Sequence, residues 1–154
     1  MIKAVLFWLW RVLPLPKFVR AAIVWIGNPK YLVSVDALIF NPENACLLFN
    51  HPYRQDYTWG LPGGYLKKGE HPQTAIQREV FEESGLEIQV IKLLDMTMSE
   101  KHHRITLIYL AEIVGEVKFT PSVEVSEFRF FPADHLPELY PNQKALIQKY
   151  SRQP

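Results

Sequence analysis

The stretch GGYLKKGEHPQTAIQREVFEESGL, Gly63–Leu86, joins a glycine pair to a crowded run of acidic residues. From Glu70 onward the only strong base in it is Arg78, although the whole chain has a formal net charge of only +1. The spacing predicts a helix over 72–84. Proline suits a first helical position, and Gly85 suits the left-handed residue that ends many helices.

Three glutamates of this predicted helix share one face. Successive residues on a helix are rotated by about 100°, so Glu79, Glu82 and Glu83 occupy an arc roughly 100° wide. Like charges at this spacing repel each other. A divalent cation relieves the repulsion, and Mg²⁺ prefers hard oxygen ligands and bridges to phosphates. A solvated acidic face is the simpler alternative for three glutamates alone.

The residues around this face fit a ligand site. Gly63 and Gly64 let the backbone approach a ligand closely. Arg78 can hold a carboxylate in a fixed orientation through its forked donors, and we expect Glu70 to be its partner.

The full spacing from Gly64 to Leu86 resembles the Nudix box, G-x5-E-x7-R-E-U-x-E-E-x-G-U with U aliphatic. Every fixed position matches, and the preceding WGLPGG resembles the usual lead-in of the family. The first thirty residues have no counterpart in the minimal family domain. The resemblance therefore predicts two parts, an apolar helical extension over 1–30 and a Nudix hydrolase domain over 31–154.

The resemblance implies an α/β fold, namely a Nudix-type α/β/α sandwich with a mixed β-sheet. It implies Mg²⁺, or alternatively Mn²⁺, held by Glu79, Glu82 and Glu83, one of which would instead be the base that activates water. The Gly63 carbonyl would be a further metal ligand. Arg78 and Glu70 would orient the loop and the catalytic glutamates.

The implied activity is hydrolysis of a nucleoside diphosphate linked to another moiety, which gives a nucleoside monophosphate and the phosphorylated moiety. ADP-ribose or another nucleotide sugar is slightly favoured. The proline found downstream of the box in typical ADP-ribose hydrolases is missing from SEKHHRIT. Oxidised triphosphates, dinucleoside polyphosphates and coenzyme-linked diphosphates stay open, as does a catalytically silent domain that only binds or senses nucleotides.

Further site candidates lie outside the box. A base from a later loop is an alternative to a box glutamate, with Glu100, Glu124 and Glu127 as candidates. Arg54 is a candidate phosphate ligand, and aromatic side chains near it are candidates for stacking on a base. The substrate-binding set is thus Arg54, Tyr57, Trp59 and Glu127, with Tyr53, His102 and His103 as weaker candidates.

The rest of the chain reads as alternating strands and helices. We expect strands over 31–40, 45–50, 87–96, 104–113 and 126–131, a loop over 51–64 and a closing helix over 141–150. The first two strands are expected to form a hairpin. The near-neutral net charge gives no sign of a basic surface for nucleic-acid binding. The single cysteine, Cys46, lies in an apolar run and cannot form an internal disulfide, which fits a cytoplasmic protein.

The first residues are strongly apolar and aromatic. The run Ala4–Trp10 is far shorter than the roughly 20 residues that span a bilayer. We expect a helix that ends at Pro14 and Pro16 and docks on the protein's own body or on a second subunit, so a homodimer is left open. Contact with a membrane surface is less favoured, and a signal peptide is the least favoured alternative.

Overall fold

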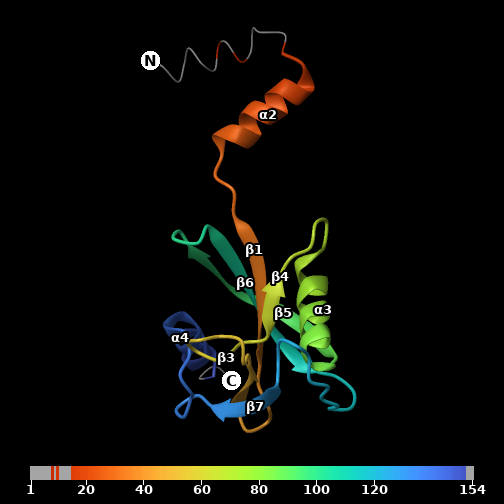
Figure 1. Cartoon of the computed structure of the whole chain (residues 1–154), viewed down its shortest axis with the longest axis vertical. Helices are drawn as coiled ribbons and strands as arrows, with labels where there is room; N and C mark the ends of the chain where they lie inside the picture. The colour runs from red at the N-terminus through yellow and green to blue at the C-terminus, as the bar shows by residue number, and fades with distance from the viewer. Residues whose placement is uncertain (1–7, 9, 11–14, 152–154) are drawn as a thin grey trace. The chain divides into compact units, whose positions relative to one another are not determined.

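The structure is a computed structural model that describes residues 8, 10 and 15–151. The chain divides into two compact units, Met1–Tyr31 and Leu32–Pro154. The second unit carries all the strands found in the described residues (Figure 1).

The main sheet of this unit has four strands in the order β4-β1-β6-β5. Its strands are β1 (Leu32–Ile39), β4 (Gly63–Tyr65), β5 (Ile88–Ser99) and β6 (Arg104–Ile113). β1 pairs in parallel with β6 and antiparallel with β4, so the sheet is mixed. A second, antiparallel sheet has the order β3-β2-β7, from β2 (Ala45–Asn50), β3 (Trp59–Gly60) and β7 (Glu127–Pro132).

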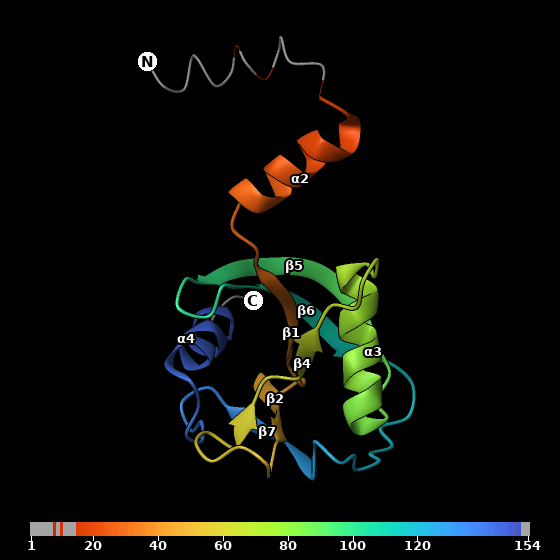
Figure 2. The same cartoon turned by 45° about the horizontal axis from the view of Figure 1, so that its top comes forward.

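Two helices cover opposite faces of the main sheet, α3 (Pro72–Ser84) and α4 (Pro141–Tyr150) (Figure 2). Alternation along β1 explains this, because successive side chains of a strand point to opposite faces. Val35, Ala37 and Ile39 pack in one core cluster with the α3 residues Ile76 and Val80. Leu38 packs in the other cluster, to which α4 contributes Leu146 and Ile147. The α/β/α sandwich with a mixed sheet is thus confirmed.

The central helix has the predicted bounds and the predicted C-terminal cap, and its N-cap is His71. The Nδ1 atom of His71 accepts a bond from the Gln73 amide at 3.4 Å, and Gly85 takes a left-handed conformation with φ of 73°. The N–H of Gly85 donates to the Phe81 carbonyl at 2.8 Å. The helix therefore ends where the glycine relieves the steric strain of that conformation.

Several predicted elements needed correction. The expected hairpin of the first two strands is wrong, because β1 and β2 belong to different sheets. An isolated antiparallel bridge, Phe40–Cys46, lies just beyond the end of β1. The expected loop over 51–64 contains β3 and the start of β4. The fifth strand runs three residues further than expected, to Ser99. Cys46 is fully buried, and this burial raises its thiol pKa to about 12.

The described part of the first unit contains helix α2 (Lys17–Gly27), none of whose residues is buried. The predicted helix that ends at Pro14 falls outside the described residues, except for Trp8 and Trp10, which are both helical. No helix among residues 8, 10 and 15–151 has both the length and the apolar character needed to cross a membrane.

Candidate active site

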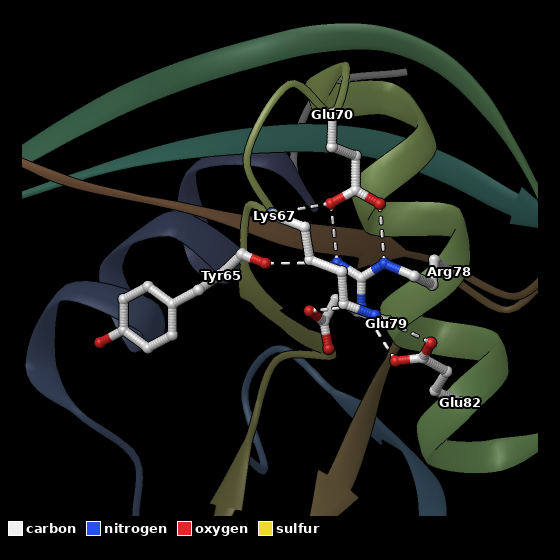
Figure 3. A network of polar contacts seen from close by, with 6 residues as sticks. All are labelled: Tyr65, Lys67, Glu70, Arg78, Glu79 and Glu82. Atoms are coloured by element: carbon white, nitrogen blue, oxygen red, sulfur yellow. Dashed lines mark hydrogen bonds and ion pairs between the residues drawn. The ribbon is translucent and has the colours of Figure 1, made fainter.

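The guanidinium of Arg78 is the centre of a polar network on α3 (Figure 3). It contacts three carboxylates at once. Nε and Nη2 bind the two oxygens of Glu70 at 2.7 and 2.9 Å, and Nη1 binds Glu79 Oε1 at 2.8 Å and Glu82 Oε2 at 2.9 Å. Arg78 is the residue type suited to this task, because its planar fork presents five donors in fixed directions.

Glu70 connects the glycine-rich loop to this helix. One of its oxygens also accepts a hydrogen bond from the Lys67 amide at 2.9 Å, and the Arg78 side chain donates to the Tyr65 carbonyl at 3.3 Å. The Arg78 guanidinium lowers the pKa of Glu70 to about 2. Figure 3 shows the Tyr65 ring turned away from these contacts, so only its backbone takes part. The loop 65–70 is therefore closed onto the helix by ionic and backbone bonds together.

The two glycines fit tightly between the sheet and the helix. A Cβ atom on Gly64 would lie 2.6 and 2.7 Å from the two carboxylate oxygens of Glu79. On Gly63 it would clash with the Val35 carbonyl oxygen and lie 2.8 Å from Asp36 Oδ1. The absence of side chains at these positions lets the Glu79 carboxylate lie directly against the backbone of β4.

Glu83 is the buried member of the acidic face, with only 6% of its surface exposed. Burial raises its pKa to about 8, and the negative charges of Glu79 and Glu124 act in the same direction. A backbone hydrogen bond from Gly63 and the charge of Arg54 oppose this shift. Within the part of the chain that the structure describes, no group donates a hydrogen bond to Glu83 Oε2. A buried carboxylate oxygen without a donor is costly, and a cation is one partner that offsets the cost.

A later loop brings Glu124 to this face. The loop is tied to the end of α3 by Thr120 N to Ser84 O at 2.8 Å and to β2 by Ser126 N to Asn50 O at 3.0 Å. Val125 anchors it in the core, where its side chain is fully buried. Glu124 itself is exposed, and its charge acts on Glu83.

Comparison with known proteins identifies this arrangement. The family model of the NUDIX domain matches residues 30–150. The chain belongs to the Nudix hydrolase family. The predicted resemblance is thereby confirmed.

Relatives and solved structures of Nudix proteins agree with this assignment. An ADP-ribose pyrophosphatase of Methanocaldococcus jannaschii is 31% identical over 128 residues, which is 78% of this chain and 73% of that protein. YjhB of Bacillus subtilis is 30% identical over 79% of this chain, and the match spans only 60% of YjhB. The crystal structure of an ADP-ribose pyrophosphatase from Streptococcus suis has a TM-score of 0.67 and 27% identity, and covers 82% of this chain and 94% of that one. The activities of these proteins agree with the predicted class of enzyme.

The Nudix box glutamates do not form a complete metal-binding site in this structure. Nudix hydrolases generally use a divalent metal. Among the described residues, no three histidine, cysteine, aspartate or glutamate side chains are gathered so that they hold a metal ion as they stand. Glu79 and Glu82 each have an oxygen on Arg78, while Glu83 has an oxygen without a donor. Carboxylate oxygens are the type of ligand that a divalent cation such as Mg²⁺ prefers. The Glu83 carboxylate is already buried away from water.

Two residues beside the Nudix box, Asp36 and His51, were not predicted from the sequence. Asp36 pairs with Gly63 across β1 and β4, and burial raises its pKa to about 6 against the opposing charges of Arg104 and Arg54 and a hydrogen bond from Gln143. An acidic residue inside the apolar stretch VSVDALIF was the available signal. His51 is fully buried, and its pKa falls to about 4 through burial and the charge of Arg54.

Arg54 is the predicted substrate-binding residue that the structure brings to this region, because its charge acts on Glu83, Asp36 and His51. Its Nη1 atom lies 2.6 Å from where a Cβ on Gly60 would be. The guanidinium therefore lies directly over the backbone that leads into the glycine pair.

The other predicted substrate residues have separate partners. The Tyr57 ring lies 4.7 Å from that of Tyr140, and Trp59 packs edge-on to Phe131 at 4.9 Å. Both line a surface pocket formed by residues 55–59, 136–139, 141 and 144. Glu127 binds Arg129 at 2.9 Å and Asn50 at 3.2 Å on the second sheet. Glu100, His102 and His103 lie in the turn between β5 and β6.

Proposed function

We propose that this protein is a Mg²⁺-dependent pyrophosphohydrolase that cleaves a nucleoside diphosphate linked to another moiety. The observation that carries the proposal is the Arg78 network, which fixes Glu79 and Glu82 beside the buried Glu83. All the charged positions of the Nudix box are present, which supports the proposal.

The metal would be held by Glu79, Glu82, Glu83 and the Gly63 carbonyl. A bound divalent cation neutralises phosphate charge and lowers the pKa of a coordinated water. The burial that raises the pKa of Glu83 also strengthens its attraction to such a cation, because charges interact more strongly away from water.

The chain's own side chains supply positioning and proton transfer. Arg78 holds the carboxylates of Glu79 and Glu82 in place, and Glu70 holds Arg78. Glu83 on the helix and Glu124 on the loop, whose charge acts on Glu83, are our two candidates for the base that accepts a proton from the attacking water. Arg54 offers a forked donor to a phosphate oxygen on the same side.

ADP-ribose or another nucleotide sugar is the substrate class that we favour. Two relatives named as ADP-ribose pyrophosphatases support it. The polar groups around Asp36, namely Arg54, Arg104 and Gln143, offer donors and an acceptor for a sugar or a base. We place the activity in the cytoplasm, and a homodimer stays a prediction.

A substrate panel tests the proposal. ADP-ribose, other sugar nucleotides, dinucleoside polyphosphates, coenzyme A, oxidised triphosphates and 5′-triphosphate RNA are incubated with Mg²⁺ or Mn²⁺, and released products are measured. RNA is included because an RNA pyrophosphohydrolase of Blochmanniella pennsylvanica is 33% identical over 80 residues. We expect turnover of a sugar nucleotide and its loss in Glu82→Gln. Tight nucleotide binding with no turnover of any compound would instead favour the silent, sensing alternative.

A further inference from the structure

Helix α2 presents its large apolar side chains to solvent. None of its residues is buried, and Phe18, Trp25 and Ile26 are each more than two-thirds exposed, at 74%, 68% and 73%. Soluble proteins seldom leave such a set uncovered on one helix. A face of this kind is typically covered by a binding partner.

The exposed residues are segregated around the helix. With about 100° between successive residues, Phe18, Trp25 and Ile26 fall on one arc, together with Val19, Ala22 and Ile23. Lys17 and Arg20 fall on the opposite arc, with Ala21 and Val24. A helix with aromatic and aliphatic residues on one side and basic residues on the other is typical of elements that lie in the plane of a membrane surface.

The charge of the whole segment has one sign. Residues 1–35 contain five lysines and arginines and no acidic residue, and Asp36 is the first carboxylate of the chain. A surface that complements this segment must be both apolar and anionic. A bilayer with anionic lipids has both properties, because it takes up the apolar face and attracts the basic residues.

Two contacts between basic and aromatic side chains support a membrane interface. The Lys30 ammonium lies 4.4 Å from the Trp25 ring centre, and the Arg20 guanidinium lies 5.7 Å from that of Trp10. Tryptophan is enriched at the level of the lipid headgroups, and lysine and arginine extend from there to the aqueous phase. We propose that α2 is an in-plane anchor that binds the chain to an anionic lipid surface.

Vesicle sedimentation of the full chain tests the anchor. Vesicles of phosphatidylcholine alone are compared with vesicles that contain about 30% phosphatidylglycerol, at about 0.05 M and 0.5 M salt. We expect binding to the anionic vesicles, weakened by high salt. Lys17→Gln with Arg20→Gln should lower the partition coefficient by about twenty-fivefold, at about fivefold for each basic residue.

A matched pair of substitutions tests the apolar arc. Ile26→Ser changes an exposed aliphatic residue on that arc, and Val24→Ser changes one on the basic arc. We expect about tenfold weaker vesicle binding for Ile26→Ser, because a buried branched side chain contributes about that much, and a much smaller effect for Val24→Ser.

Three results would overturn the proposal. They are no binding to any vesicle, equal binding to neutral and anionic vesicles, and equal effects of Ile26→Ser and Val24→Ser. A second copy of the chain is the competing occupant of this face. The mass of both variants in solution, measured by light scattering, distinguishes it from a lipid surface. A dimer that Ile26→Ser dissociates, without vesicle binding, would assign this face to a second copy of the chain instead.

Discussion

Arg78 and Glu70 form a two-point ion pair, in which Nε binds Oε1 at 2.7 Å and Nη2 binds Oε2 at 2.9 Å. The pair leaves Nη1 free to hold Glu79 and Glu82. The Arg78 side chain is only 17% exposed, so water competes weakly for these bonds. The pair thus couples the loop that follows the glycines to the acidic face of α3.

Arg78→Lys should lower both activity and stability, because one ammonium cannot replace the fork that serves three carboxylates. We expect kcat to fall by about tenfold to a hundredfold. The free energy of unfolding should fall by about 1.5–3 kcal/mol, the range for hydrogen bonds to charged groups. Initial rates on the substrate found by the panel, together with urea unfolding, measure the two effects. A wild-type kcat in Arg78→Lys would show that the orientation of the glutamates does not depend on the fork.

Glu83→Gln should separate activity from stability. The substitution removes a carboxylate from a buried position where its charge is disfavoured, so the free energy of unfolding should stay unchanged or rise. We expect kcat to fall by about a hundredfold or more, the usual effect of losing an acid–base group. Glu87→Gln is the matched control, since Glu87 is exposed just beyond the helix. Equal activity of the two variants would exclude Glu83 from the reaction.

Gly64→Ala should disturb the site through sterics alone. The added methyl group would meet the Glu79 carboxylate oxygens at 2.6 and 2.7 Å, so this side chain must move. A displacement of about 1 Å at a catalytic group is enough to lower the rate by about a hundredfold. Gly27→Ala is the control, because its Cβ meets no atom within 4 Å. If both variants keep full kcat, the position of Glu79 is not critical.

Glu124→Gln and Glu127→Gln distinguish two acids that lie three residues apart. The charge of Glu124 acts on Glu83, whereas Glu127 is bound to Arg129 and Asn50 on the second sheet. We expect kcat to fall by at least about tenfold in Glu124→Gln and to change little in Glu127→Gln. The opposite pattern would restore Glu127 as a site residue and remove Glu124. The measurement is kcat across a pH series with saturating metal.

His51 should make stability depend on pH. The unfolded imidazole takes up a proton near pH 6.5, and the folded one only near pH 4, because burial and the charge of Arg54 lower its pKa. Between these values the unfolded state binds more protons, so this contribution to stability falls as the pH falls. The loss over the window is about 3 kcal/mol.

The His51 effect is isolated by comparing wild type with His51→Gln in urea unfolding at several pH values. Asp36 and Glu83 also have shifted pKa values, but they contribute to both curves. The difference between the two curves should change between pH 6.5 and pH 4 and be flat above pH 7. A difference that does not depend on pH would show that His51 is protonated as readily in the folded as in the unfolded state.

The sequence by itself determined the parts of the site that are local. Arg78, Glu79, Glu82 and Glu83 lie within two turns of one helix, so the period of the helix places them on a shared face. The bounds of α3, α4 and β6 were predicted to the residue, because prolines and Gly85 mark the helix ends and an apolar run marks the strand. The family followed from the same local spacing.

Only the tertiary structure decided which distant residues join that face. Asp36 lies beside Gly63 because β1 pairs with β4, and β1 pairs with β6 rather than with the β2 that follows it in the chain. Glu124 reaches Glu83 because its loop is tied to Ser84 and Asn50. Such pairings depend on how whole strands and helices bury their apolar faces against each other. The period of one segment carries no information about that choice, so the sequence predicted the acidic face, named Glu124 only as one of three candidates and did not point to Asp36.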